Sequence, residues 1–332
     1  MQPFRYVRAD DIPSAVRASN AASAFLAGGT SLVDCMKLDA VRAEALVDIN
    51  GLQATHGRIE MRPDGLYLGA LVRMAQLAEH EGVNRDYPVL AQTMRFAASA
   101  QLRNMASLGG NVLQRTRCSY FRDTRWTACN KRDPGSGCAA MEGVNRKHAV
   151  LGVADRCISA YPGDFAQALV ALDARVQIAG ANGARAIRFE DLHRGPDTPH
   201  QETVLQPGEL ITGFMVPAGA WTRRSLYLKV RDRASYEFAL ASAAVGLDLT
   251  PDGTVREARL GLGGLAYKPW RAHAAEDFLK GRKLDAQSAA EAGRVALQGA
   301  QPRTGNAFKV QLGARTVERA LLQAVQLKTS EV

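Results

Sequence analysis

Residues 14–51 read SAVRASNAASAFLAGGTSLVDCMKLDAVRAEALVDING, and the succession of elements in this stretch decides the fold. Its pattern predicts a helical stretch, a short apolar strand over 24–27, a glycine turn, a second helix and a second strand over 45–49. The glycine turn stands between a strand and a helix, where backbone amides are free to meet a ligand. We therefore treat this turn as the first candidate site.

The turn contains Gly28 and Gly29, followed by Thr30 and Ser31. Glycine lets the backbone approach a ligand closely, and the two hydroxyl groups add donors beside the amides of the helix start. Such a turn suits a pyrophosphate, but glycines are equally expected in any tight strand-to-helix connection. The turn lacks the three glycines of a Rossmann fingerprint and the Gly-Lys-Ser/Thr of a Walker loop.

A second glycine pair occurs in NMASLGGNVLQ, residues 104–114, where Gly109 and Gly110 are flanked by Ser107 and Asn111. It follows a region for which the pattern predicts a helix over 87–100. Two such turns, each edged by small polar residues, make a shared anionic ligand more plausible than one turn does. Two unrelated turns remain the alternative.

Four of the five cysteines lie in residues 118–157, a stretch that we call the cysteine segment. Cys118, Cys129, Cys138 and Cys157 are separated by ten, eight and eighteen residues, and no regular period runs between them. A connection of this length without regular structure usually carries function. Tetrahedral sulfur ligation suits zinc or an iron–sulfur cluster, although the short paired spacing of zinc ribbons is missing. Disulfides and unrelated thiols stay open, and Cys35 is best explained as a buried core residue.

After the cysteine segment, Asp164 follows a Pro-Gly pair and precedes an apolar helix, so an N-cap role explains it. A hairpin is predicted next, and a domain ends at about 217–220. Beyond it the pattern predicts three strands, the last two joined by Pro-Asp-Gly at 251–253. Three helices follow, near 271–279, 286–297 and 308–326. The C-terminal piece is therefore predicted to be an antiparallel sheet with helices on one face.

Composition excludes several classes of protein. The 332 residues are 46% hydrophobic and 23% charged, which is typical of a soluble globular protein of one or two domains. The chain contains no apolar run long enough to span a bilayer, and its start lacks the features of a signal peptide. The net charge of +9 comes from scattered basic residues, which argues against nucleic acid as a partner.

Taken together, these motifs resemble the FAD-binding subunits of the molybdenum hydroxylases, the xanthine dehydrogenase and carbon monoxide dehydrogenase family. The resemblance covers nearly the whole chain, through FLAGGTSLVDCMKL, SLGGN, ISAYPGDFAQALVALDA and LKVRDRASYEFALASAAV. The segments CSYFRD, CNKRDPGSGC and GVNRKHA look closest to one branch, the FAD subunit of bacterial, periplasmic-type aldehyde oxidoreductases. Most of the family lacks this insertion.

The resemblance implies an α+β fold. A PCMH-type FAD-binding domain of the vanillyl-alcohol-oxidase kind, with two subdomains, would occupy residues 1–220 and carry a cluster-binding insertion at 112–157. A C-terminal α+β domain like that of the CO dehydrogenase flavoprotein would follow over 221–332. The resemblance also implies a set of FAD-binding residues. They are Leu26, Ala27, Gly28, Gly29, Thr30, Ser31, Leu32, Val33, Ser107, Gly110, Asn111, Ile158, Asp164 and Lys229. No histidine stands in the first turn, so we expect non-covalent FAD.

The same resemblance implies that Cys118, Cys129, Cys138 and Cys157 hold a [4Fe-4S] cluster. Six basic residues of the segment would raise its potential, and Arg146 and His148 are candidate hydrogen-bond donors to the sulfurs or to the flavin. We expect no catalytic residue in this chain, because its role would be electron relay.

The implied partners are a large subunit that binds the molybdenum cofactor, a small [2Fe-2S] subunit and an external electron acceptor; no membrane span is expected. The chain carries no export signal of its own, so the complex would be cytoplasmic, or periplasmic by co-export with a partner. The alternatives are a free-standing FAD-dependent oxidase or reductase, the flavin subunit of a 4-hydroxybenzoyl-CoA reductase-like complex, and a structural zinc subunit.

Overall fold

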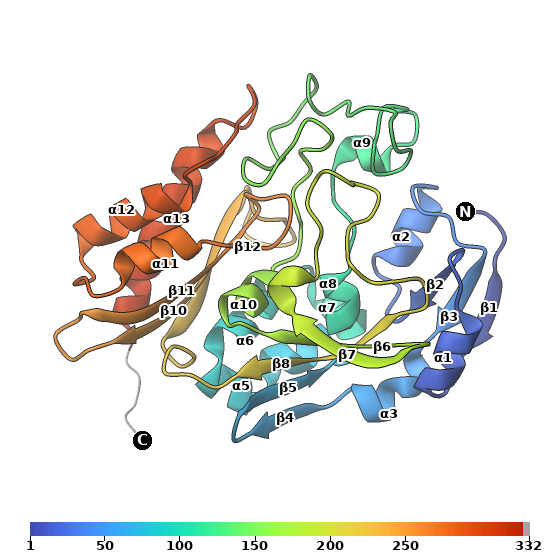
Figure 1. The fold of residues 1–332 in the computed structure, drawn as a ribbon, viewed down its shortest axis with the longest axis horizontal. Helices are drawn as coiled ribbons and strands as arrows, with labels where there is room; N and C mark the ends of the chain where they lie inside the picture. The colour runs from blue at the N-terminus through green and yellow to red at the C-terminus, as the bar shows by residue number, and fades with distance from the viewer. Residues whose placement is uncertain (328–332) are drawn as a thin grey trace.

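The computed structural model describes residues 1–327, which form three sheets and the helices that cover them (Figure 1). A small parallel sheet lies at one end of the molecule, and a five-stranded antiparallel sheet forms its base. A four-stranded antiparallel sheet lies at the other end and carries the C-terminal helices. The cysteine segment arches over the face between the two ends.

The N-terminal subdomain is a three-stranded parallel sheet in the order β1-β3-β2. Central strand β3 is the most buried of the three strands, and its Val47 is fully buried. Helix α1 begins with a capping box, in which the Asp11 side chain accepts a hydrogen bond from the Ser14 amide at 2.7 Å. The elements are β1 (Arg5–Arg8), α1 (Ile12–Ala18), β2 (Ser23–Leu26), α2 (Leu32–Lys37) and β3 (Ala45–Asp48). The predicted order of strand, turn, helix and strand is confirmed.

A five-stranded antiparallel sheet, in the order β4-β5-β8-β6-β7, supports the rest of the first domain. Its apolar face packs against helices through aromatic contacts such as that between Phe165 and Phe214, whose ring centroids are 5.8 Å apart. The strands are β4 (Ile59–Arg62), β5 (Gly65–Gly69), β6 (Arg175–Gly180), β7 (Gly183–Arg188) and β8 (Leu210–Pro217). The hairpin is confirmed, and Gly180 pairs with Gly183 across a two-residue turn.

The first domain also contains a series of short helices. The helix predicted over 87–100 is in fact two helices, because Ala98 takes a positive φ of 49° and Ser99 caps a new start. The helices are α3 (Gln53–His56), α4 (Met74–Glu79), α5 (Glu81–Asp86), α6 (Pro88–Phe96), α7 (Ala100–Met105), α8 (Leu108–Val112), α9 (Ser119–Arg122) and α10 (Phe165–Ala171). Single 3-10 turns occur at Asn50–Leu52 and Phe189–Asp191.

The C-terminal domain is an antiparallel sheet, in the order β12-β11-β10-β9, with three helices against it. The predicted strands, Pro-Asp-Gly turn and helices are all present, and the short fourth strand was not predicted. The elements are β9 (Ser225–Val230), β10 (Ala241–Leu249), β11 (Val255–Gly263), β12 (Trp270–Arg271), α11 (His273–Leu279), α12 (Ala286–Ala296) and α13 (Phe308–Val325).

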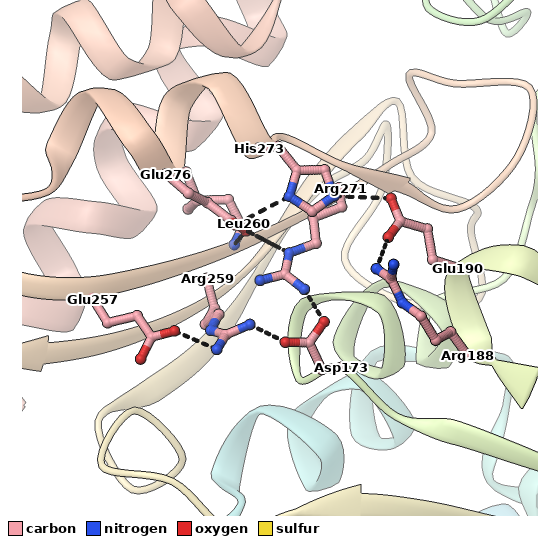
Figure 2. A network of polar contacts seen from close by, with 9 residues as sticks. All are labelled: Asp173, Arg188, Glu190, Glu257, Arg259, Leu260, Arg271, His273 and Glu276. Atoms are coloured by element: carbon pink, nitrogen blue, oxygen red, sulfur yellow. Dashed lines mark hydrogen bonds and ion pairs between the residues drawn. The ribbon is translucent and has the colours of Figure 1, made fainter.

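A network of ion pairs joins the two domains, and Figure 2 shows it from close by. Asp173, which follows α10 with a φ of 54°, accepts hydrogen bonds from Arg259 and Arg271 of the C-terminal sheet. Arg271 also bonds Glu276, its Nε lying 2.9 Å from one carboxylate oxygen, and that oxygen accepts from the Leu260 amide at 2.7 Å. The Arg271 and Glu276 side chains are 5% and 9% exposed, so this pair is buried, whereas Asp173 is 35% exposed.

Candidate functional site

A cavity of about 740 Å³ opens between the N-terminal subdomain, the short helices and the start of the C-terminal sheet. Its volume lies in the range of small-molecule and cofactor sites. The lining includes most of the residues predicted to bind FAD: Ala27, Gly28, Gly29, Thr30, Ser31, Leu32, Ser107, Gly110, Asn111, Asp164 and Lys229. The fold thus brings together two glycine turns and two charged residues that lie far apart in the sequence.

The first glycine turn presents unpaired backbone donors at this cavity. In the part of the chain that the structure describes, the N–H groups of residues 28–32 donate no hydrogen bond. Gly29 has a φ of 70°, and a Cβ on Gly28 would overlap the carbonyl of Met105. The turn is therefore held tightly against the end of α7 with its amides free, which is the arrangement that binds an anion.

In the second turn, the backbone amides of both glycines already donate hydrogen bonds within the protein. The amide of Gly109 donates to Ala70 at 2.8 Å, and that of Gly110 donates to the Ser107 hydroxyl at 3.2 Å. The buried Asn111 Oδ1 makes no hydrogen bond within residues 1–327. This turn would therefore contribute side chains to a ligand, whereas the first turn would contribute backbone amides.

Asp164 and Lys229 form a buried ion pair in the wall of the cavity. Their charged atoms are 2.8 Å apart, and the side chains are 5% and 2% exposed. Asp164 also accepts a hydrogen bond of 2.5 Å from Tyr227, and burial together with the Asp164 charge raises the pKa of that tyrosine. Asp164 precedes α10, but its side chain makes no capping hydrogen bond. The N-cap position of Asp164 is therefore confirmed, but its carboxylate does not cap the helix, because long-range pairing occupies it.

Three of the predicted FAD-binding residues do not line the cavity: Leu26, Val33 and Ile158. Ile158 is fully buried beside the cysteine segment, where it packs with Tyr120 and Ala140. Leu26 belongs to strand β2 and Val33 to helix α2, next to residues that do line it. Their predicted roles stay predictions.

The four cysteines of the cysteine segment lie near one another. All five cysteines of the chain are free thiols, which leaves no disulfide within the segment. Cys129 and Cys138 pair as a backbone bridge, and a hydrogen bond from Cys157 lowers the pKa of Cys138 to about 7. Burial raises the pKa of Cys118 to about 11, and Cys118 interacts electrostatically with both Cys157 and Cys129.

His148 places its Nε2 atom 3.2 Å from the Cys118 sulfur, as expected for a hydrogen-bond partner of these thiols. No group of three or more His, Cys, Asp or Glu side chains within residues 1–327 is arranged to hold a single metal ion. Cysteine thiolates are the usual ligands of iron–sulfur clusters, so the residue types match a cluster, although their described arrangement forms no metal site.

Most of the basic residues of the cysteine segment form ion pairs or hydrogen bonds with other protein groups. Arg146 pairs with Asp232, Lys147 with Glu237, Lys131 with Glu202, Arg125 with Asp123, and Arg122 with Asp34. Arg132 donates instead to backbone carbonyls. These pairs reduce the positive potential that the basic residues could exert on the sulfurs, and they tie the segment to other parts of the fold.

Several residues that line the cavity were not predicted from the sequence. Arg117 and Arg122 reach the cavity from the start of the cysteine segment, and Arg233, Tyr236 and Phe238 reach it from the loop between β9 and β10. Those loop residues lie within the quoted stretch LKVRDRASYEFALASAAV, from which only the lysine was selected. Tyr236 is 56% exposed and has a φ of 52°, a rare conformation that could not be read from its sequence.

Comparison with known proteins agrees with this geometry. Residues 2–219 match the family described as the FAD binding domain in molybdopterin dehydrogenase, and residues 226–324 match the CO dehydrogenase flavoprotein C-terminal domain. None of the helices in residues 1–327 combines the length and hydropathy that a bilayer crossing requires.

Individual relatives extend over almost the whole chain. The aldehyde oxidoreductase FAD-binding subunit PaoB of Escherichia coli is 45% identical over 331 residues, which cover 98% of this chain and 99% of PaoB. The glyceraldehyde dehydrogenase medium chain of Sulfolobus acidocaldarius is 28% identical, covering 85% of this chain and 83% of its own. A carbon monoxide dehydrogenase structure from Hydrogenophaga pseudoflava has the same fold, with a TM-score of 0.76, 24% identity and 98% coverage of both chains. The chain therefore belongs to the FAD-binding oxidoreductase subunits of the molybdenum hydroxylase, or xanthine dehydrogenase, family.

Proposed function

We propose that this chain is the FAD- and [4Fe-4S]-carrying electron-transfer subunit of a molybdenum-containing aldehyde oxidoreductase. One observation carries the flavin part of the proposal. The first glycine turn lines a cavity of cofactor size with the unpaired amides of residues 28–32. A diphosphate would satisfy these donors, because backbone N–H groups at a strand-to-helix turn bind phosphate oxygens.

The other predicted residues can be assigned roles around the same ligand. Ser107 and Asn111 would hold the diphosphate from the second turn. Asp164 and Lys229, an ion pair in the lining, would contact the ribityl or adenosine part of FAD and the flavin, respectively. When bound, the flavin supplies the ability to accept electrons and pass them on, and the protein supplies position and electrostatics.

The cluster part of the proposal is supported by the chemistry of the donor set. Cys118, Cys129, Cys138 and Cys157 are free, mutually interacting thiols in one segment, and His148 contacts the first of them. Cysteine thiolates are the ligands of such clusters, and they must lose their protons to bind. The raised pKa of Cys118 means that cluster binding releases a proton from that thiol.

We further propose the partner subunits, the substrate class and the compartment of the complex. Its partners would be a large molybdenum-cofactor subunit and a small [2Fe-2S] subunit, with an external acceptor receiving the electrons. PaoB, 45% identical, is itself an aldehyde oxidoreductase subunit, which supports an aldehyde as the substrate of the complex. The complex would be cytoplasmic, or periplasmic by export with a signal-bearing partner. We also propose that the FAD-binding domain and the C-terminal domain meet at about residue 220.

Cofactor analysis of the purified chain tests both parts of the proposal. We expect a flavin absorption band together with broad iron–sulfur absorption, and analysis should find FAD, iron and sulfide. Cys138→Ser should lose iron and sulfide while it keeps FAD; Asp39→Asn, a change outside the segment at a residue paired with nearby Arg42, should keep all three. A colourless protein that contains zinc would refute the proposal. Bleaching of the flavin by an aldehyde, with no partner subunit present, would favour a free-standing oxidase instead.

A further inference from the structure

We propose that Asp34 is a positioning residue that couples the first glycine turn to the cysteine segment, so that a ligand bound at either one stabilises the other. This inference deepens the proposed function, since it takes FAD as the ligand of the glycine turn. The carboxylate lies in α2, the short helix that starts directly after the turn. Lys37, three residues along α2, is the partner that the local sequence suggests, but the ion pairs of Asp34 are with the distant Arg117 and Arg122.

Two arginines bind this carboxylate: Arg117, just before the cysteine segment, and Arg122, within it. Arg122 donates from both terminal nitrogens, at 2.9 and 3.1 Å, and Arg117 donates from one at 3.0 Å. Arg117 directly precedes Cys118, and Arg122 ends helix α9. A two-pronged arginine–carboxylate contact fixes orientation as well as distance. Asp34 therefore holds the first predicted cluster ligand in a defined place relative to the glycine turn.

The contact is partly shielded from water, which increases its strength. The side chains are 38% exposed for Asp34, 27% for Arg117 and 24% for Arg122. Partial burial raises the pKa of Asp34, but the hydrogen bonds and charges of the two arginines outweigh it and hold the pKa below its usual value. A pair of this kind is worth more than a fully exposed ion pair, although solvent screening still weakens it.

An apolar contact reinforces the polar one at the next residue. Cys35 is 1% exposed and packs with Phe121 and Cys129 of the cysteine segment. Consecutive residues of α2 thus bind the segment through charge and through packing. This also explains why Cys35 is buried although it lies near the cavity.

These contacts couple the two sites because α2 is only six residues long. A helix of that length is not stable by itself, so tertiary contacts determine its position. A ligand that orders the glycine turn also orders α2, and α2 then presents Asp34 to the arginines. Coupling between two binding sites is reciprocal, so order in the cysteine segment must favour ligand binding at the turn.

The experiment combines FAD affinity with amide hydrogen exchange on the full chain. Asp34→Asn removes the charge with little change in shape. We expect it to weaken FAD binding about tenfold, as expected for a charged hydrogen-bonding partner of this exposure. Peptides covering residues 25–37 and 117–133 should exchange faster even without FAD. FAD should protect both peptides in the unmodified chain, and only the first in the variant.

Matched variants separate coupling from a direct contact with FAD. Arg122→Gln should reproduce the loss of affinity, and the double variant should lose little more, because both changes break the same contact. Asp39→Asn is the control: within residues 1–327, Asp39 forms its ion pair with nearby Arg42 alone, and the loss of that pair should leave both measurements unchanged.

The inference is overturned if Asp34→Asn leaves exchange in residues 117–133 unchanged, or if the two single changes add up in full. If the unmodified chain binds no FAD, the proposed function fails, and exchange of both peptides in the FAD-free variants still decides the coupling. If it binds FAD but Asp34→Asn affects neither readout, the coupling fails while the proposed function stands.

Discussion

Replacing Lys229 with methionine should destabilise the folded chain by about 3 kcal/mol, because it leaves a buried carboxylate without its cation. Lys229 and Asp164 lie 2.8 Å apart with side chains 2% and 5% exposed. Breaking a buried pair from one side costs about 3–5 kcal/mol. Asp164 keeps its hydrogen bond from Tyr227, at 2.5 Å, so the loss should fall at the lower end of this range.

Urea unfolding of the FAD-free chain measures this loss. Trp126, Trp221 and Trp270 report unfolding by fluorescence, and FAD must be absent because a ligand of the folded state would add its own stabilisation. The midpoint should fall while the slope of free energy against urea stays unchanged. For 332 residues, the same loss corresponds to a melting temperature lower by about 4 °C.

A second variant tests the reason for the loss. Lys229→Met combined with Asp164→Asn should be more stable than Lys229→Met alone by about 1 kcal/mol or more, because no unpaired charge is then buried. FAD affinity should fall in both variants. The reasoning is refuted if Lys229→Met costs less than about 1 kcal/mol, or if the double variant is the less stable of the two.

Three further predictions concern the turn, the junction and one histidine. Gly28→Ala should weaken FAD binding at least about tenfold, since its Cβ would overlap the Met105 carbonyl; Gly195→Ala, where a Cβ meets no atom within 4 Å, should bind FAD normally in the same titration. Arg271→Met should lower the unfolding free energy by about 3 kcal/mol in urea, because Glu276 and Asp173 lose a buried partner while Arg259 remains; an unchanged midpoint would contradict the assigned role of the junction in Figure 2. Burial lowers the pKa of His193 to about 4 from an ordinary 6.5, so the unfolded chain binds the extra proton and stability falls as pH drops from 6.5 toward 4. His193→Phe should remove about 1.4 kcal/mol per pH unit of that fall, as measured by urea midpoints at pH 6 and 4.5.

Local patterns in the sequence were enough to predict most helices and strands, and also the first glycine turn and the hairpin turn of the C-terminal domain. Gly28 and Gly29 stand between an apolar strand and a helix, and the Pro-Asp-Gly turn at 251–253 joins two strands. These features depend on neighbours a few residues away, because backbone conformation and side-chain periodicity are local properties. The spacing of the cysteines likewise marked out residues 118–157 as unusual before any fold was known.

Only the tertiary structure decided which residues meet. The ion pair of Asp164 with Lys229 joins positions 65 residues apart, and the contacts of Asp34 with Arg117 and Arg122 join positions 83 and 88 apart. Locally, Asp164 resembles an N-cap and Asp34 an ordinary charge on a short helix. Their contacts come from the packing of distant segments, which hydrophobic burial drives and which no short window of sequence contains.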